Sequence, residues 1–224
     1  HVRYSVLNVS WYDTKRKSVR VKQAGRGGTG RVFRHKNIKA IVVRYSSLKG
    51  DSNNPANMDM IRKAGQRMNK EIIENDPKQN NMRGVGTGHL PPIMSYFDLL
   101  PVNNFRYGTH PDAKNLDVTV WEELFTQGIV EDCWLGCSMA CAHGVDHFHL
   151  QTGPYKDEVV TVDGPEYETI AGEGSNLGIF DPLPIIEMNF YCDTYGIDTI
   201  SFANSVAFVM ECYAEGIIDE KITG

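Results

Sequence analysis

The sequence lacks an apolar run of about 18 residues, the length that a transmembrane helix requires, so we expect no membrane span. It also lacks a basic segment followed by an apolar one, as a secretory signal would show, and this favours a cytoplasmic protein. Internal repeats and low-complexity tracts are absent. With 41% hydrophobic and 23% charged residues among 224, the composition excludes a disordered, collagenous or coiled-coil chain and indicates a globular one.

Acidic residues are almost absent from the first 50 positions. These positions hold 13 of the 23 lysines and arginines but only Asp13 among the 28 acids. Such an asymmetry indicates two structural units, or a basic surface that faces an anionic partner. Because residues 38–43 are too apolar for a nucleic-acid-binding arm, we expect no nucleic-acid partner and favour a phosphate-bearing small molecule.

The hydrophobic periodicity predicts strands near the start of the chain and helices beyond it. We expect a strand at residues 2–9, a loop or hairpin at 11–22 and a buried strand at 38–44. The segment DSNNPAN, residues 51–57, has loop chemistry and is the predicted boundary between an α+β unit at 1–50 and a mainly α-helical unit at 51–224. The expected helices cover residues 31–37, 58–74, 91–99, 118–130, 199–215 and a stretch that begins at Pro182.

Cysteine is scarce but clustered, because three of the five residues form the pattern C-x3-C-x3-C. They are Cys133, Cys137 and Cys141, and on a helix these positions would share one face. Clustered cytosolic cysteines bind metal more often than they form disulfides, but a zinc site and a [4Fe–4S] cluster each need four ligands. Any of three nearby histidines would complete a zinc site: His143, His147 and His149. An iron–sulfur cluster, a zinc site and three packed thiols all stay open.

A glycine-rich turn at residues 25–30, GRGGTG, matches the pattern G-x-G-x-x-G. A dinucleotide-binding fold requires a long helix after this turn and an acid at the end of the next strand. Here the helix has room for about two turns and the expected strand ends at Arg44, so an NADP site is disfavoured. A tight turn without a ligand stays open, and so does a nest of backbone N–H groups that holds a phosphate or another anion beside Arg26.

The segment DTYGID, residues 193–198, predicts a tight connection between two helices. Gly196 fits the left-handed position that ends one helix, and Asp198 fits the N-cap of the next. If both acids of the segment also face one pocket, they suit the edge of a heterocycle rich in N–H donors, because a carboxylate accepts two parallel hydrogen bonds. Upstream, Glu166 and Glu168 lie two positions apart, and one of them would act as a general acid or base if burial raised its pKa.

Five segments occur in the order found in the tungsten-containing aldehyde ferredoxin oxidoreductase family, which the sequence resembles over nearly its whole length. They are residues 24–30 with 38–43 (AGRGGTG, IKAIVV), 100–105 with 108–109 (LPVNNF, GT), the cysteine cluster, 164–169 with 174–178 (GPEYET, GSNLG), and 193–201. The family is much longer than 224 residues. The resemblance implies that residues 1–50 are the tail of a β-rich pterin-binding domain and that residues 51–224 form most of a helical domain.

The resemblance also implies cofactor-binding residues. Those between the iron–sulfur cluster and a pterin would be Arg26, Gly27 and Gly28. Those of the first of two pterin-binding turns would be Asp193, Gly196, Ile197 and Asp198. Three ligands of a [4Fe–4S] cluster would be Cys133, Cys137 and Cys141, although the family spacing is C-x2-C-x3-C and its fourth cysteine lies further along. Two acids would have separate roles, Glu168 in proton transfer near the tungsten and Glu187 in binding a bridging iron at a dimer interface.

The family chemistry is the oxidation of an aldehyde to a carboxylate at tungsten, or molybdenum, held by two pterins. Electrons pass through the [4Fe–4S] cluster to ferredoxin or another iron–sulfur acceptor, and Mg²⁺ is a further expected cofactor. The resemblance implies a homo-oligomer, with the remaining part of the enzyme in the same gene product or in a companion subunit. The alternatives are reduction of an aromatic-ring thioester and a non-catalytic binding module stapled by zinc.

Overall fold

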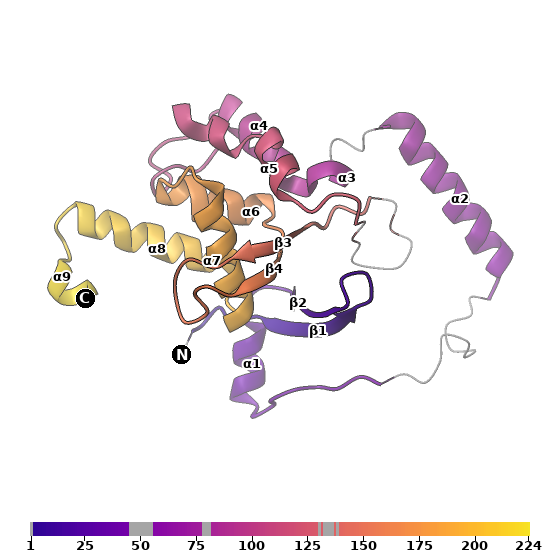
Figure 1. The fold of residues 1–224 in the computed structure, drawn as a ribbon, viewed down its shortest axis with the longest axis horizontal. Coiled ribbons are helices and arrows are strands. Elements are labelled where there is room, and N and C mark those ends of the chain that lie inside the picture. Colours follow the sequence, from indigo (N-terminus) through magenta and orange to yellow (C-terminus); the bar gives the residue numbers. More distant parts are fainter. Residues whose placement is uncertain (1, 45–55, 78–81, 130, 132–136, 138) are drawn as a thin grey trace.

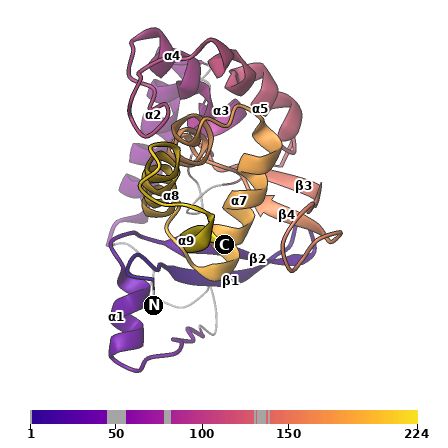
Figure 2. The same cartoon turned by 90° about the vertical axis from the view of Figure 1, so that its left-hand side faces the viewer.

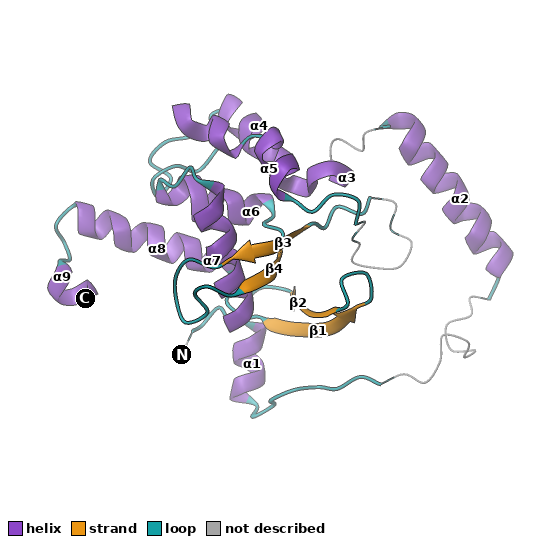
Figure 3. Cartoon of the chain, in the orientation of Figure 1, coloured by secondary structure: helices purple, strands orange, loops and turns teal. Residues whose placement is uncertain are grey.

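The computed structural model describes residues 2–44, 56–77, 82–129, 131, 137 and 139–224. Figure 1 shows a body built mainly of helices, and Figure 3 shows two small strand pairs in orange among them. The mixture agrees with the predicted α+β start and mainly helical remainder, although one strand pair lies in the remainder. None of the described helices combines the length and the apolar character that crossing a bilayer requires.

The chain begins with an antiparallel hairpin. Strand β1 (Leu7–Asp13) pairs with β2 (Ser18–Ala24), so that the first residue of one lies opposite the last of the other. This confirms the hairpin alternative at residues 11–22. The strand expected at residues 2–9 overlaps β1 only from Leu7 onward, because pairing with β2 rather than the local pattern sets where the strand runs. The glycine-rich turn then leads into the two-turn helix α1 (Thr29–His35).

The buried strand predicted at residues 38–44 is wrong. These residues have no strand partner and are exposed, and Val42 keeps 89% of its surface accessible. A strand is stabilised by hydrogen bonds to a neighbour, and none of the described strands lies beside this segment. The apolar run alone was therefore an insufficient signal.

The helix predicted at residues 58–74 is confirmed as α2 (Met58–Asn75). The side chain of Asn57 caps it by accepting a hydrogen bond from the Met60 N–H at 2.9 Å. No residue of α2 is buried, and the helix stands apart from the body in Figure 1. The predicted boundary at 51–57 lies mostly outside the described residues.

The middle of the chain forms short helices. They are α3 (Met82–Val85), α4 (Leu90–Tyr96) and α5 (Val118–Leu124). Helices were expected at 91–99 and 118–130, so both predictions hold, but α5 ends six residues early where Phe125 turns into the core. The predicted N-cap is also confirmed, since the Asp117 carboxylate accepts a hydrogen bond from the Val118 N–H at 2.6 Å.

A second hairpin and four α-helices follow, with a π-helical turn (Ile170–Gly174) and a 3₁₀ turn (Ser175–Leu177) between the first two helices. The hairpin consists of β3 (Gly144–His149) and β4 (Val159–Asp163), with a bulge between Val145 and Phe148. The helices are α6 (Tyr167–Thr169), α7 (Pro182–Tyr195), α8 (Thr199–Ala214) and α9 (Glu220–Thr223). The caps expected for α7 are present, because the Asp181 carboxylate accepts from the Leu183 N–H at 3.0 Å and Gly196 ends the helix in the left-handed region.

The main core lies between α5, the second hairpin and α7. Its fully buried large side chains include Trp121, Leu150, Ile170, Ile185 and Ile186. β2 and β4 both contact α7, and Figure 2 shows the β1–β2 hairpin running beneath this helix. The β1–β2 hairpin therefore packs against the later part of the chain.

Candidate functional site

The connection between α7 and α8 is the tight turn that the sequence predicts. Gly196 has φ 66°, and the Ile197 N–H donates a hydrogen bond to the Cys192 carbonyl at 2.8 Å. Asp198 occupies the N-cap position of α8, but its carboxylate bonds to side chains rather than to the helix backbone. The Ser201 hydroxyl donates to it at 2.7 Å, and the Arg26 guanidinium forms an ion pair with it.

The Arg26–Asp198 ion pair joins the glycine-rich turn to the turn between α7 and α8. Residues 4–6 lie between the two turns and bond to both. The Gly30 N–H donates to the Ser5 carbonyl at 3.0 Å, and the Val6 N–H donates to the Gly196 carbonyl at 2.8 Å. The structure thus brings together two motifs that the sequence analysis singled out separately, through a segment that it expected only to be a strand.

A cavity of about 240 Å³ opens where these turns meet the end of β4. Its lining includes residues of three sequence motifs, namely Gly25, Arg26, Gly164, Glu166, Asp193, Ile197 and Asp198, and also Asp163. Gln23, Thr169, Asn189 and Thr199 also line it. No motif in the sequence marked Gln23 and Asn189, whereas Thr169 and Thr199 lie in the segments 164–169 and 193–201. Their contribution depends on the fold, since β2, α6, α7 and α8 each bring one of them.

Burial raises the pKa of three carboxyl groups that line the cavity, those of Asp163, Glu166 and Asp193. Burial raises the pKa of Asp193 well above its ordinary value, and the charge of Asp163 adds to the effect. Burial also raises the pKa values of Asp163 and Glu166, against the opposing influence of Lys22. The cavity therefore offers carboxyl oxygens as hydrogen-bond acceptors, in surroundings that disfavour their charged form.

Of the two glutamates in the GPEYET segment, Glu166 faces the cavity. Its carboxylate accepts a hydrogen bond from the Thr87 hydroxyl, and this hydroxyl accepts one from the Tyr167 N–H at 2.8 Å. Glu168 is exposed and does not line the cavity. Its proton-transfer role stays a prediction.

Several basic side chains near the N-terminus form ion pairs with acids of the same chain. Arg16 contacts Glu131 at 2.5 Å, Arg20 contacts Glu131 at 2.8 Å, and Lys22 contacts Asp163 at 2.7 Å. The two arginine side chains and the acids that face them are almost fully buried. The acid-poor beginning of the sequence therefore finds its counter-charges in the acid-rich remainder.

The cysteine cluster is described only in part, because Cys133 lies outside the described residues. Cys137 and Cys141 are half-buried, and neither lies in a helix, so the helical arrangement does not apply to them. Cys141 lies close to the cavity wall, since a Cβ added to Gly86 would stand 2.5 Å from the Cys141 carbonyl and 3.8 Å from the Glu166 carboxylate. Within the described ranges, no group of three His, Cys, Asp or Glu side chains is arranged to hold a metal.

A family model described as aldehyde ferredoxin oxidoreductase, domains 2 and 3, matches residues 63–224. The chain belongs to the aldehyde ferredoxin oxidoreductase family. It is 34% identical over 206 residues to a tungsten-containing aldehyde ferredoxin oxidoreductase of Pyrococcus furiosus, and 31% identical over 205 residues to the one of Pyrococcus abyssi. Each match covers 91% of this chain and 31% of the relative. The chain thus spans about a third of the length of these relatives.

A less similar relative also matches. It is an aliphatic sulfonate oxidoreductase, WOR-like subunit, of Pyrococcus furiosus, 28% identical over 204 residues, which are 90% of this chain and 30% of the relative. The resemblance inferred from the five sequence segments is therefore confirmed at the level of the family.

In the present chain, Glu187 is buried in α7, and its carboxylate binds the loop that follows β3. Its carboxylate accepts hydrogen bonds from the Thr152 N–H at 2.7 Å, the Thr152 hydroxyl at 2.6 Å and the Gln151 N–H at 3.1 Å. These contacts give the side chain a structural role. Iron binding by Glu187 at a dimer interface stays a prediction.

The zinc alternative needs one of three histidines as its fourth ligand, and one of them, His143, bonds elsewhere. His143 Nε2 lies 2.6 Å from the Gly84 carbonyl, so this nitrogen carries the proton. Burial lowers the pKa of His143. His147 and His149 are exposed on β3.

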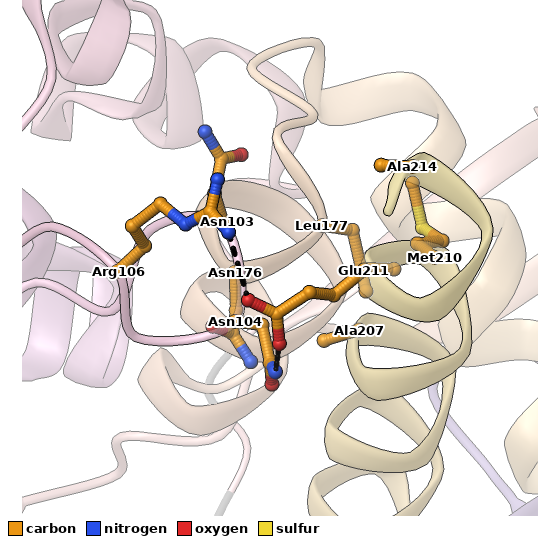
Figure 4. Close-up of a pocket in the computed structure, with 9 residues that line it drawn as sticks. All are labelled: Asn103, Asn104, Arg106, Asn176, Leu177, Ala207, Met210, Glu211 and Ala214. Atoms are coloured by element: carbon orange, nitrogen blue, oxygen red, sulfur yellow. Dashed lines mark hydrogen bonds and ion pairs between the residues drawn. The ribbon is translucent and has the colours of Figure 1, made fainter. Parts of the chain in front are cut away.

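A second cavity of about 240 Å³ lies beside α8 (Figure 4). Its charged groups already bond to one another, because Arg106 contacts Glu211 at 3.1 Å and Asn104 donates to the same carboxylate at 2.5 Å. Figure 4 shows both side chains pointing to Glu211. The cavity at the two turns, with its open carboxyl groups, is the better candidate for a polar ligand.

Proposed function

We propose that this chain forms part of the cofactor-binding body of a tungstopterin and iron–sulfur oxidoreductase. The activity proposed for the whole enzyme is oxidation of an aldehyde to a carboxylate, with electrons passed to ferredoxin. The observation that supports this most strongly is the meeting of the glycine-rich turn and the Asp193–Asp198 turn at one polar cavity. The matches to tungsten-containing relatives extend over 91% of the chain.

The residues present fit a pterin with a phosphate group. Gly25 and Gly27 have positive φ angles of 72° and 78°, and nothing lies within 4 Å of the place where a Cβ would stand. A phosphate can therefore approach their backbone closely. Asp193 and Asp198 supply carboxyl oxygens for ring N–H groups, and Arg26 holds Asp198 in place.

The metal with its pterins would supply the redox chemistry, and the protein would bind, orient and protect it. We propose Cys133, Cys137 and Cys141 as ligands of a [4Fe–4S] cluster. The position of Cys141 against Gly86, beside Glu166, supports a cluster next to the pterin cavity. Molybdenum in place of tungsten, a bound Mg²⁺ and proton transfer by Glu168 belong to the same proposal.

Elemental analysis of the native protein tests this proposal. We expect tungsten or molybdenum, and about four irons for each metal centre. Electron paramagnetic resonance of the reduced protein should give the signal of a [4Fe–4S]⁺ cluster. Zinc as the only metal would contradict the proposal and favour the stapled binding module.

A second candidate is a role as one subunit of a split enzyme. The match to a protein named as a subunit favours it. If it is right, the native protein purifies with a companion polypeptide, and neither part alone retains tungsten.

Assays with an aldehyde and with an aromatic-ring thioester distinguish aldehyde oxidation from the alternative reaction, reduction of an aromatic-ring thioester.

A further inference from the structure

The cavity contains a buried hydrogen-bond donor that no described residue satisfies. Gln23 lies near the end of β2 and lines the cavity, and its Nε2 atom is buried without a partner. An amide donor left in this state is destabilising, so such groups are rare unless a ligand or water bonds to them. The donor therefore points to a ligand acceptor in the cavity.

An acceptor on another element faces the same space. Glu166 also lines the cavity, and the Thr87 hydroxyl holds its Oε2 atom. No described residue bonds to its Oε1 atom. The bond between Thr87 and the Tyr167 N–H fixes the hydroxyl in turn, so the free oxygen of Glu166 is held in a defined position.

The neighbouring polar groups are already engaged. Asp163 accepts from Lys22 and Arg20, and Asn189 donates to the Asp163 carbonyl at 2.6 Å. Asp198 accepts from Arg26 and from a serine hydroxyl. These bonds leave the Gln23 amide without an acceptor, and they leave the carboxyl groups of Glu166 and Asp193 with unused acceptor capacity.

We infer that Gln23 and Glu166 read the ring of the bound pterin, with Gln23 donating to the ring carbonyl and Glu166 accepting from a ring N–H. The inference rests on the proposed function. The pyrimidine edge of a pterin presents a carbonyl next to N–H groups, so one amide donor and one carboxyl acceptor match it. The two side chains add to the contacts of Arg26 and the Asp193–Asp198 turn, and they select a ring with this order of groups.

Two substitutions in the native protein test the inference. Gln23→Met keeps the size of the side chain but removes the donor, and Glu166→Gln exchanges the carboxyl for an amide. Since a hydrogen bond contributes about 1 kcal/mol and 1.4 kcal/mol is tenfold, each variant should release pterin about fivefold faster in mild denaturant. Released pterin is measured by fluorescence after oxidation, and tungsten by elemental analysis. Gln66→Met and Glu123→Gln, both at exposed helical positions, are matched controls.

Gln23→Glu distinguishes the loss of the donor from a folding defect, because it keeps a polar side chain on the strand and replaces the donor by an acceptor. We expect it to release pterin at least as fast as Gln23→Met, with unchanged circular dichroism. Wild-type release rates in both Gln23 variants and in Glu166→Gln would overturn the inference while leaving the proposed function intact. A wild-type protein without any pterin would instead remove the proposed function itself.

A crystal structure of the native protein gives the direct answer. Ring atoms within hydrogen-bond distance of Gln23 Nε2 and Glu166 Oε1 would support the inference. A pterin whose ring lies beyond the reach of both atoms would overturn it.

Discussion

Replacing Glu173 by glutamine is expected to remove a pH dependence from the stability of the protein. Glu173 is fully buried in the short π-helical turn Ile170–Gly174. The Cys192 thiol donates to its Oε1 atom at 3.3 Å, and Oε2 has no partner among the described residues. Burial raises the pKa of this carboxyl to about 8, and the nearby charge of Asp193 adds to the effect.

The sign and the size of the effect follow from proton linkage. The unfolded chain loses this proton near pH 4.5, whereas the folded chain keeps it up to about pH 8. Between these values the folded state binds more protons than the unfolded state, so stability is fully present below pH 4.5 and falls as the pH rises. One pKa unit is about 1.4 kcal/mol, which gives a loss of about 5 kcal/mol across the window. Glutamine does not titrate, so the variant lacks this loss.

Denaturant unfolding at a series of pH values measures the difference. The free energy of unfolding of the wild type, minus that of Glu173→Gln, should fall by about 1.4 kcal/mol per pH unit between pH 5 and 8. The exposed control Glu123→Gln should follow the wild type at every pH. Infrared spectroscopy near pH 6 should show the carbonyl stretch of a protonated acid that is missing in Glu173→Gln. Parallel stability curves for wild type and variant, together with no such band, would refute the reasoning.

Substitutions at three further positions have defined outcomes. Glu131→Ala removes one acceptor that the buried guanidinium groups of Arg16 and Arg20 share, while Asp13, Asp146 and Asp163 still pair with them. The free energy of unfolding should therefore fall by about 2 kcal/mol, and a loss below about 0.5 kcal/mol would contradict this. Asp181→Ala removes the N-cap of α7 and should cost about 1 kcal/mol in the same assay, whereas Asp181→Asn should cost little. Gly86→Ala forces a methyl group against a backbone carbonyl, and we expect less iron per chain by elemental analysis; unchanged iron content would count against a cluster at this wall.

Local signals in the sequence predicted most of the helices. Asp117, Asp181 and Gly196 act as caps through contacts within a few residues, and each is found where the pattern placed it. The strand predicted at residues 38–44 failed for the opposite reason. A strand exists only if a partner is present, and a partner distant in sequence leaves no local trace.

In the candidate site, too, local features could be predicted from the sequence, whereas contacts between distant residues could not. The sequence marked the glycine-rich turn and the Asp193–Asp198 turn, because each needs glycine at a left-handed position. That the turns meet through Arg26 and Asp198, 172 positions apart, could be inferred only from the family resemblance. Gln23 carries no motif, and only the fold shows that its amide is buried in the cavity.

The cavity draws on both predicted units of the chain. Gln23, Gly25 and Arg26 belong to the first 50 residues, whereas Glu166 and Asp193 belong to the remainder. The buried arginine ion pairs of the β1–β2 hairpin fix the two parts against each other, since these acids lie beyond residue 130. A ligand in the cavity would contact both parts and so stabilise their association, because binding to the assembled form alone shifts the equilibrium toward it. The uneven distribution of charge along the sequence is thus part of how the cavity is assembled, and it favours units that depend on each other over units that fold separately.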